Sequence, residues 1–148
     1  MHVDAAHYTP LDTELLPDGR ILPVEDTRYD FRSPRTFAAA DPGATGYDIN
    51  LVLREGRDAD RPSATASSTR SGLELRHWTD QPGVQLFDAN RPVIAVPGHD
   101  GEIYRPFSGL CLEAQHFPDS VHHPDWPSII CTPDAPYRQR LDIEIALK

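Results

Sequence analysis

The chain has 148 residues, enough for one domain, and its 39% apolar and 25% charged residues are typical of a folded globular protein rather than a disordered one. Fourteen basic residues against 23 acidic ones give a formal charge of −9, which argues against nucleic acid or an anionic membrane as a partner. No apolar run approaches the ~18 residues that a membrane span needs. The first residues lack the basic and apolar regions of a signal peptide, so the sequence predicts a cytoplasmic protein.

The pattern along the chain is one of short strands separated by turns. Fifteen prolines and nine glycines interrupt it every few residues, which leaves little room for helices of ordinary length. Many short strands with frequent turns predict one all-β domain over residues 1–148, an antiparallel β-sandwich. The predicted strands, in chain order, are His2–His7, Tyr47–Arg54, Ala64–Thr69, Leu73–Thr79, Gly83–Ala89, Val93–Val96, Gly109–Gln115 and Arg138–Leu147.

The strand over residues 109–115 is the most informative of these because it carries one carboxylate among apolar neighbours. Successive strand side chains point to opposite faces, so Cys111, Glu113 and Gln115 share one face, and Leu110, Leu112 and Ala114 share the other. The composition predicts a buried strand. A carboxylate there is costly unless it is hydrogen-bonded or has a function, which makes Glu113 a candidate functional residue.

The last predicted strand alternates cleanly. Leu141, Ile143, Ile145 and Leu147 alternate with Asp142, Glu144 and Ala146. This alternation predicts a strand with one face on the core and the other in water.

Cysteine and histidine usage predicts no metal site and no disulfide. The only two cysteines, Cys111 and Cys131, lie in strand-like apolar settings and are predicted to be buried and reduced. Three histidines and two aspartates lie close together in the chain, but their spacing matches no zinc-ligand motif and prolines separate them. These residues are predicted to be structural parts of a loop: His116, Asp119, His122, His123 and Asp125.

Several motifs occur in a recognisable order. They are Tyr8-Thr-Pro-Leu-Asp12, Gly46-Tyr-Asp-Ile-Asn50, Thr79-Asp-Gln-Pro-Gly-Val-Gln85, and the run from Ser108 to Asp119 that contains Glu113. In this order and at this spacing they resemble the motifs of the aldose 1-epimerase (galactose mutarotase) family, and they cover nearly the whole chain. One position departs from the family pattern, because Ile49 stands where the family usually has a histidine.

This resemblance implies a carbohydrate site in a β-supersandwich fold. By position, Glu113 would be the catalytic base that takes the proton from the anomeric hydroxyl of the sugar. Asp48 and Gln85 match residues that hydrogen-bond sugar hydroxyls. The expected ligand is a small aldohexose such as glucose or galactose, whose α and β anomers the enzyme interconverts. The reaction needs a base at the C1 hydroxyl and an acid at the ring oxygen, and no metal or redox cofactor.

The same resemblance implies that part of the site lies elsewhere. The 148 residues match only the C-terminal half of the family's fold, and the other half carries the histidine that resembles the general acid. Met1 falls where a family member is in mid-strand, so we expect a fragment, a split gene or a late start. Uncovered strand edges and an apolar face are then expected, with either a separate N-terminal half or self-association to cover them.

Other interpretations of these residues stay open at this stage. Asp48 could end a turn, and Gln85 could form a cross-strand polar pair. Trp78 and Trp126 could stack on a sugar, although packing in the core or in a loop is the default for tryptophan. The function has three readings: an epimerase that needs a second half, a non-catalytic carbohydrate-binding remnant of the family, or a product that does not fold stably.

Overall fold

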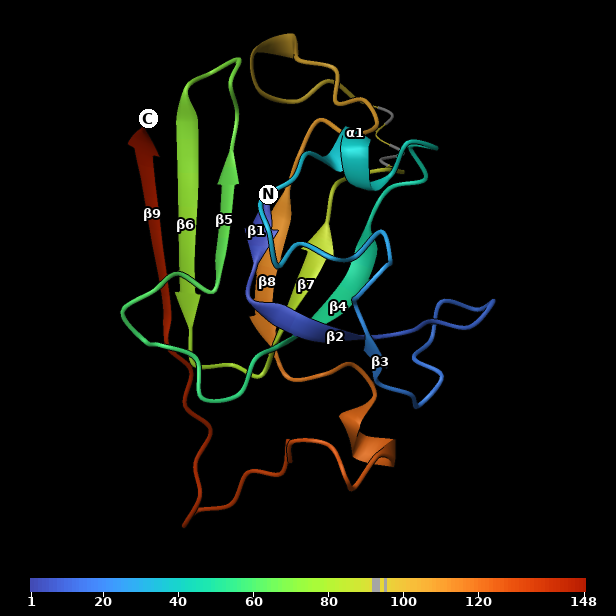
Figure 1. Cartoon of the computed structure of the whole chain (residues 1–148), viewed down its shortest axis with the longest axis vertical. Coiled ribbons are helices and arrows are strands. Elements are labelled where there is room, and N and C mark those ends of the chain that lie inside the picture. The colour runs from blue at the N-terminus through green and yellow to red at the C-terminus, as the bar shows by residue number, and fades with distance from the viewer. Residues whose placement is uncertain (92–93, 95) are drawn as a thin grey trace.

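Two antiparallel sheets form a sandwich in the computed structural model of the chain, which describes residues 1–91, 94 and 96–148 (Figure 1). One sheet has five strands in the order β3 (Leu22–Pro23), β2 (Ala5–Thr9), β4 (Asp48–Leu53), β7 (Gly83–Phe87) and β8 (Cys111–Gln115). The other has four, in the order β1 (His2–Val3), β5 (Ala64–Ser67), β6 (Leu73–Thr79) and β9 (Leu141–Leu147). Helical structure in the described residues is limited to α1 (Phe37–Ala40) and the 3₁₀ turns η1 (His99–Gly101) and η2 (Ser120–His122). The predicted all-β sandwich is confirmed.

The predicted strands correspond closely to the observed ones. The strand over residues 73–79 has the predicted bounds, and most of the others are a few residues shorter than predicted. The first prediction, residues 2–7, divides into β1 and β2, which belong to different sheets, so the chain changes sheet at Asp4. The predicted strand Val93–Val96 lies partly outside the described residues, at positions 93 and 95.

The core lies between the sheets and follows from the alternation along their central strands. In β4 the odd-numbered residues Ile49, Leu51 and Leu53 are buried, and in β7 Val84 and Leu86 are fully buried. The position that departs from the family pattern, Ile49, therefore points into the core. The remaining core side chains come from both sheets and from the loop before β4: Val3, Ala5, Val24, Phe31, Ala40, Tyr47 and Ala64.

One histidine is fully buried on the four-stranded sheet. The Ser63 hydroxyl donates a hydrogen bond to the backbone carbonyl of His77 (2.9 Å) and lies 3.0 Å from its ring Nδ1. Because the single Ser63 hydroxyl proton is donated to the carbonyl, the ring Nδ1–H of His77 is the donor to the Ser63 oxygen. The other ring nitrogen, Nε2, is buried with no partner among the described residues. Burial lowers the pKa of His77 below its usual value near 6.5.

The strand β9 does not have the predicted buried face. Its four large aliphatic side chains are exposed, from 42% for Leu141 to 80% for Leu147. The reason is the strand order, because β9 ends the four-stranded sheet and pairs only with β6 among the described residues. The alternation was read correctly, but no part of the chain that the structure describes covers this apolar face. The expected uncovered apolar face is confirmed.

The strand β8 is likewise not the buried strand that its composition predicted. Cys111 and Glu113 are exposed, and the rest of the strand is half-buried, because β8 ends the five-stranded sheet beside β7. The prediction of buried cysteines is also wrong. Cys111 and Cys131 are both exposed, although neither forms a disulfide.

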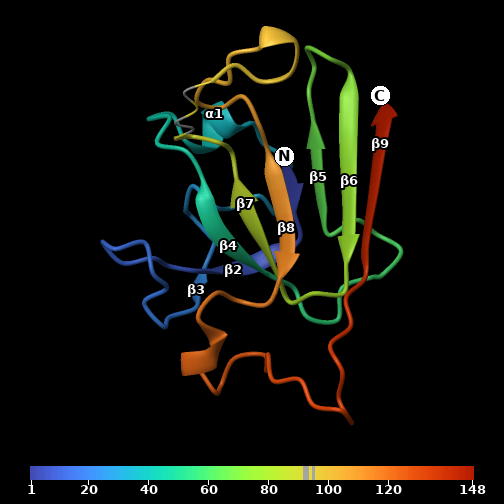
Figure 2. The same cartoon turned by 180° about the vertical axis from the view of Figure 1, so that it is seen from behind.

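A long connection, residues 116–140, runs from β8 to β9 beyond one end of both sheets (Figures 1 and 2). Trp126 is buried within it, where its ring meets Phe117 edge-on and stacks on His123 at 4.2 Å between ring centroids. His122 contacts Asp119 at 2.5 Å. Over the described residues, no group of three or more His, Cys, Asp and Glu side chains is placed to hold a metal ion. No helix in the same residues is long and apolar enough to cross a membrane.

Candidate functional site

A row of polar side chains crosses four adjacent strands of the five-stranded sheet. Thr9 on β2 is directly opposite Asn50 on β4, Asn50 is opposite Gln85 on β7, and Gln85 is opposite Glu113 on β8. Residues directly opposite one another in antiparallel strands lie on the same face. This face is the one that points away from the core, because the alternating residues Ile49, Leu51, Val84 and Leu86 are the buried ones.

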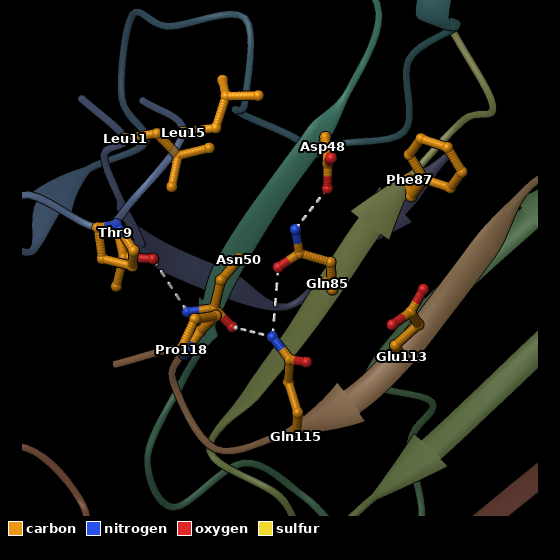
Figure 3. A pocket seen from close by; sticks show the side chains of 11 residues that line it. Thr9, Leu11, Leu15, Asp48, Asn50, Gln85, Phe87, Glu113, Gln115 and Pro118 are labelled. Carbon is orange, nitrogen blue, oxygen red and sulfur yellow. Dashed lines mark hydrogen bonds between the residues drawn. The ribbon is translucent and has the colours of Figure 1, made fainter. Parts of the chain in front are cut away.

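Two further polar residues extend this row. Asp48 lies two residues before Asn50, and Gln115 lies two residues after Glu113, so each shares the face of its neighbour. Together these side chains line an open cavity of about 380 Å³ (Figure 3). Its lining residues are Thr9, Leu11, Leu15, Pro17, Asp48, Asn50, Gln85, Phe87, Glu113, Gln115 and Pro118.

The apolar wall of the cavity comes from the loop after β2. The Asp12 carboxylate accepts hydrogen bonds from the backbone N–H of Glu14 (2.8 Å) and Leu16 (3.1 Å) and so closes this loop on itself. Leu15 adopts a left-handed conformation with φ 64° and is 61% exposed. At Gly19 a Cβ would lie 2.8 Å from the His123 ring, so the absence of a side chain lets the loop contact the 116–126 segment.

The two carboxylates of the site differ in their contacts. The Gln85 side-chain amide donates a hydrogen bond of 2.7 Å to Asp48 Oδ1. The exposed Glu113 carboxylate accepts no hydrogen bond and forms no ion pair with any of the residues that the structure describes. As far as the described residues go, both Glu113 oxygens are therefore open to a ligand on the cavity wall.

The amides of the site are connected to one another across the strands. Gln115 Nε2 donates to Gln85 Oε1 (3.2 Å) and to Asn50 Oδ1 (3.4 Å). Asn50 Nδ2 in turn donates to the Thr9 hydroxyl (3.3 Å). Asn50 and Thr9 are 1% and 0% exposed, so the floor of the cavity is a buried, hydrogen-bonded layer, and its rim carries the carboxylates.

All three residues proposed from the sequence, Asp48, Gln85 and Glu113, line this one cavity. Asp48 begins β4 rather than ending a turn, and Gln85 does form the cross-strand pairs that were the alternative for it, while its side chain also faces the cavity. The sequence reasoning missed Thr9 and Asn50 as parts of the site. The two-residue spacing from Asp48 was the available signal for Asn50.

Among the described residues that line the cavity, no side chain is an acid at neutral pH. Of the residues that the structure describes, those lining the cavity include no histidine, lysine, arginine, tyrosine or cysteine. The nearest loop histidine in the sequence, His116, does not line it, and its ring centroid lies 6.2 Å from that of Tyr137. The site can accept protons and hydrogen bonds at its carboxylates but has no built-in proton donor.

Comparisons with known proteins agree with the motifs. A family model described as aldose 1-epimerase matches residues 1–144. Galactose mutarotase from Mus musculus is 36% identical over 137 residues, which cover 91% of this chain and 40% of the mouse protein. Aldose 1-epimerase from Escherichia coli is 31% identical, with 88% of this chain and 39% of that protein covered.

A solved structure shares the fold. A GalM/aldose epimerase homologue from C. elegans matches with a TM-score of 0.78 and 24% identity, covering 97% of this chain and 43% of that one. The resemblance read from the sequence motifs is confirmed. The chain spans about 40% of the length of the curated relatives that it matches.

Proposed function

Because the chain belongs to the aldose 1-epimerase family, we propose that its cavity binds an aldohexose such as glucose or galactose and takes part in interconverting the α and β anomers. One observation carries this proposal. The Glu113 carboxylate, which has no partner among the described residues, and the hydrogen-bonded Asp48–Gln85 pair line the same open, polar cavity.

Glu113 is the base in this proposal. It takes the proton from the anomeric hydroxyl, and the electron pair of that O–H forms the C1 carbonyl as the bond from C1 to the ring oxygen breaks. The ring oxygen takes a proton from an acid at the same time. Rotation about the C1–C2 bond and reversal of these steps close the ring as the other anomer. Both proton transfers reverse, so the enzyme is unchanged after one turnover.

Asp48 and Gln85 hold the sugar in this proposal. Two neighbouring strand intervals separate β4 from β8, a distance of about 9–10 Å, so a sugar ring that lies over Gln85 on the strand between them would reach both Asp48 and Glu113. A carboxylate accepts from hydroxyl groups, and the amide of Gln85 donates to them. Leu11 and Leu15 on the loop wall provide apolar contact area for the carbon-bound hydrogens of the ring.

The acid must come from polypeptide outside these residues. The cavity lining supports this, because the described residues in it include no proton donor at neutral pH. We accordingly propose that residues 1–148 form a single unit that corresponds to the C-terminal part of an aldose 1-epimerase domain. A complementary N-terminal part would bring the acid and cover the exposed edges of β8 and β9, with self-association as the alternative way to cover them.

A non-catalytic sugar-binding function is the second candidate, and the same missing proton donor favours it. Polarimetry separates the two. The rate at which fresh α-glucose or α-galactose mutarotates is measured with the purified chain, and again after adding the N-terminal part of a relative such as the mouse galactose mutarotase. We expect no acceleration by the lone chain and acceleration by the mixture. Sugar binding without any acceleration in an assembled mixture would support the non-catalytic function instead.

A cytoplasmic location is also a proposal, and it is based on the sequence alone. Fractionation of cells that express a tagged chain tests it.

A further inference from the structure

We propose that Gln115 is a positioning residue, which fixes the orientation of the Gln85 amide so that one Gln85 N–H holds Asp48 and the other is presented to a ligand hydroxyl. Gln115 is the branch point of a hydrogen-bonded chain. From its Nε2 one branch runs through Gln85 to Asp48, and the other runs through Asn50 to Thr9 (Figure 3).

The direction of this chain follows from its carboxylate end. An ionised Asp48 can only accept hydrogen bonds, so Gln85 must turn its NH₂ group towards it. The Gln85 carbonyl oxygen then faces Gln115, which must supply an N–H to it. Both hydrogens of the Gln115 NH₂ group are used, because the second one goes to Asn50 Oδ1. No other assignment of these amides satisfies all four contacts.

The Asn50 branch makes this arrangement rigid. Asn50 and Thr9 are almost completely buried, and the Asn50 NH₂ group is committed to the Thr9 hydroxyl. A buried acceptor left without a donor is costly, so the Asn50 oxygen holds the Gln115 amide in place. Gln115 in turn prevents the Gln85 amide from turning over.

A glycine makes room for this junction. Gly83 is the cross-strand partner of Gln115, and a Cβ on it would lie 2.6 Å from Asn50 Oδ1 and 3.1 Å from the Phe117 ring. The contact with Asn50 is closer than real Cβ atoms come to their neighbours, and Asn50 is short and enclosed. Any larger residue at position 83 would therefore displace the oxygen that Gln115 binds.

The consequence for a ligand is a defined pattern of donors and acceptors. The Gln85 NH₂ group keeps one N–H after its bond to Asp48, and the second Asp48 oxygen and the Gln115 carbonyl oxygen have no partner among the described residues. A hydroxyl that accepts from Gln85 and donates to Asp48 fits this pattern. This step rests on the proposed sugar-binding function, whereas the orientation of the amides does not.

The orientation is tested first without sugar, by the side-chain amide NMR signals of the ¹⁵N-labelled chain. A glutamate at position 115 can only accept, so in Gln115→Glu we expect the Gln85 amide to reverse and the Asp48–Gln85 hydrogen bond to be lost. Gly83→Ala should shift the Gln85 amide signal too, through Asn50. The matched control is Gln139→Glu, because Gln139 donates to the Ala114 carbonyl and lines no part of the cavity.

An unchanged Gln85 signal in folded Gln115→Glu and Gly83→Ala would overturn the proposal. If either variant fails to fold, Gln115→Met gives the same test, since it removes the donor at similar size. A glucose or galactose titration then measures the consequence, and we expect affinity to fall about tenfold in Gln115→Glu but not in Gln139→Glu. Failure of the unmodified chain to bind either sugar would count against the proposed function, while a reversed Gln85 amide would still support the positioning role.

Discussion

The strands β8 and β9 occupy equivalent places, each at the end of its sheet, yet their exposed faces have opposite chemistry. On β8 the exposed face carries Glu113 and Gln115 above a polar cavity. On β9 both faces are exposed, and the one that the alternation predicted to be buried carries only aliphatic side chains, of which Ile145 is 64% exposed. The sequence predicted a buried β8 and a β9 with one face on the core, and both predictions were wrong because each strand lies at the end of its sheet.

This difference in chemistry indicates that the two exposed faces bind different kinds of partner. A polar, concave face with an unpaired carboxylate is suited to a small polar ligand, because each of its groups can be hydrogen-bonded by that ligand. An exposed aliphatic face has no hydrogen-bonding groups for a sugar and is stabilised only by burial against other apolar groups. We therefore assign ligand binding to the β8 side and protein contact to the β9 side. The following predictions test that assignment.

The largest effect is expected at Glu113. In an enzyme assembled with a complementary N-terminal part, Glu113→Gln should lower kcat by about 10²–10⁴-fold while sugar binding persists. Glutamine keeps the size and one acceptor oxygen but cannot take a proton at neutral pH. Polarimetry of the assembled variant measures it. A kcat close to that of the unmodified enzyme would show that Glu113 is not the base.

A smaller effect is expected at Asp48. Its carboxylate accepts from Gln85 and, in our proposal, from a sugar hydroxyl, and hydrogen bonds to charged groups contribute about 1.5–3 kcal/mol. Asp48→Ala should thus raise KM roughly tenfold or more, with a smaller change in kcat. Steady-state kinetics on the assembled enzyme provide the measurement. Unchanged KM would remove Asp48 from the sugar site.

A substitution on β9 should weaken binding of the complementary N-terminal part and leave sugar binding unchanged. Ile143→Asn removes an exposed aliphatic side chain whose full burial would contribute about 1.5–3 kcal/mol, so the dissociation constant for the complementary part should rise about tenfold. The matched control is Glu144→Asn, on the opposite face of the same strand. Equal effects of the two substitutions, measured by calorimetry, would contradict the assignment of the aliphatic face.

The smallest effect concerns stability below neutral pH. The lowered pKa of His77, caused mainly by burial, means that the unfolded chain binds a proton at a higher pH than the folded chain. Stability should consequently fall as pH drops below about 6.5, by at most about 1.4 kcal/mol per pH unit for this one group. The loss ends below the pKa of the folded state, where both states are protonated.

Denaturant unfolding of His77→Gln between pH 5 and 8 checks this, since the substitution should flatten that pH dependence. Burial lowers the pKa of His2 as well, so His2→Gln serves as the comparison. Arg57, whose charge also lowers the pKa of His77, stays in place in both variants. An unaltered slope in His77→Gln would mean that the buried ring does not titrate differently in the two states.

The strands and the three candidate residues could be predicted from the sequence, but the segments that pack around them could not. Local alternation is sufficient to locate β6 and to put Glu113 and Gln115 on one face. It does not contain the strand order, and burial at β8 and β9 depends on which strands lie beside them. Local sequence placed most strands to within a few residues, whereas the predicted burial was wrong at β8 and β9, where it depends on distant segments.

The network of the site was hidden for a similar reason. Thr9, Asn50 and Gln85 are far apart in the sequence and become neighbours only through the register of three strands. Asn50 lies in a strand-like run, and nothing in that run indicates that its side-chain oxygen meets Gln115. Gly83 likewise reads as part of a turn signal, and its close approach to Asn50 is visible only in three dimensions.

Titration of the lone ¹⁵N-labelled chain with galactose or glucose tests the central claim most directly. We predict that the backbone signals of β8 and the side-chain amides of Gln85 and Gln115 shift with increasing sugar, while the backbone signals of β9 do not move. Shifts confined to β9, or no shift at either strand with sugar at tens of millimolar, would contradict the assignment of the sugar site to the β8 cavity.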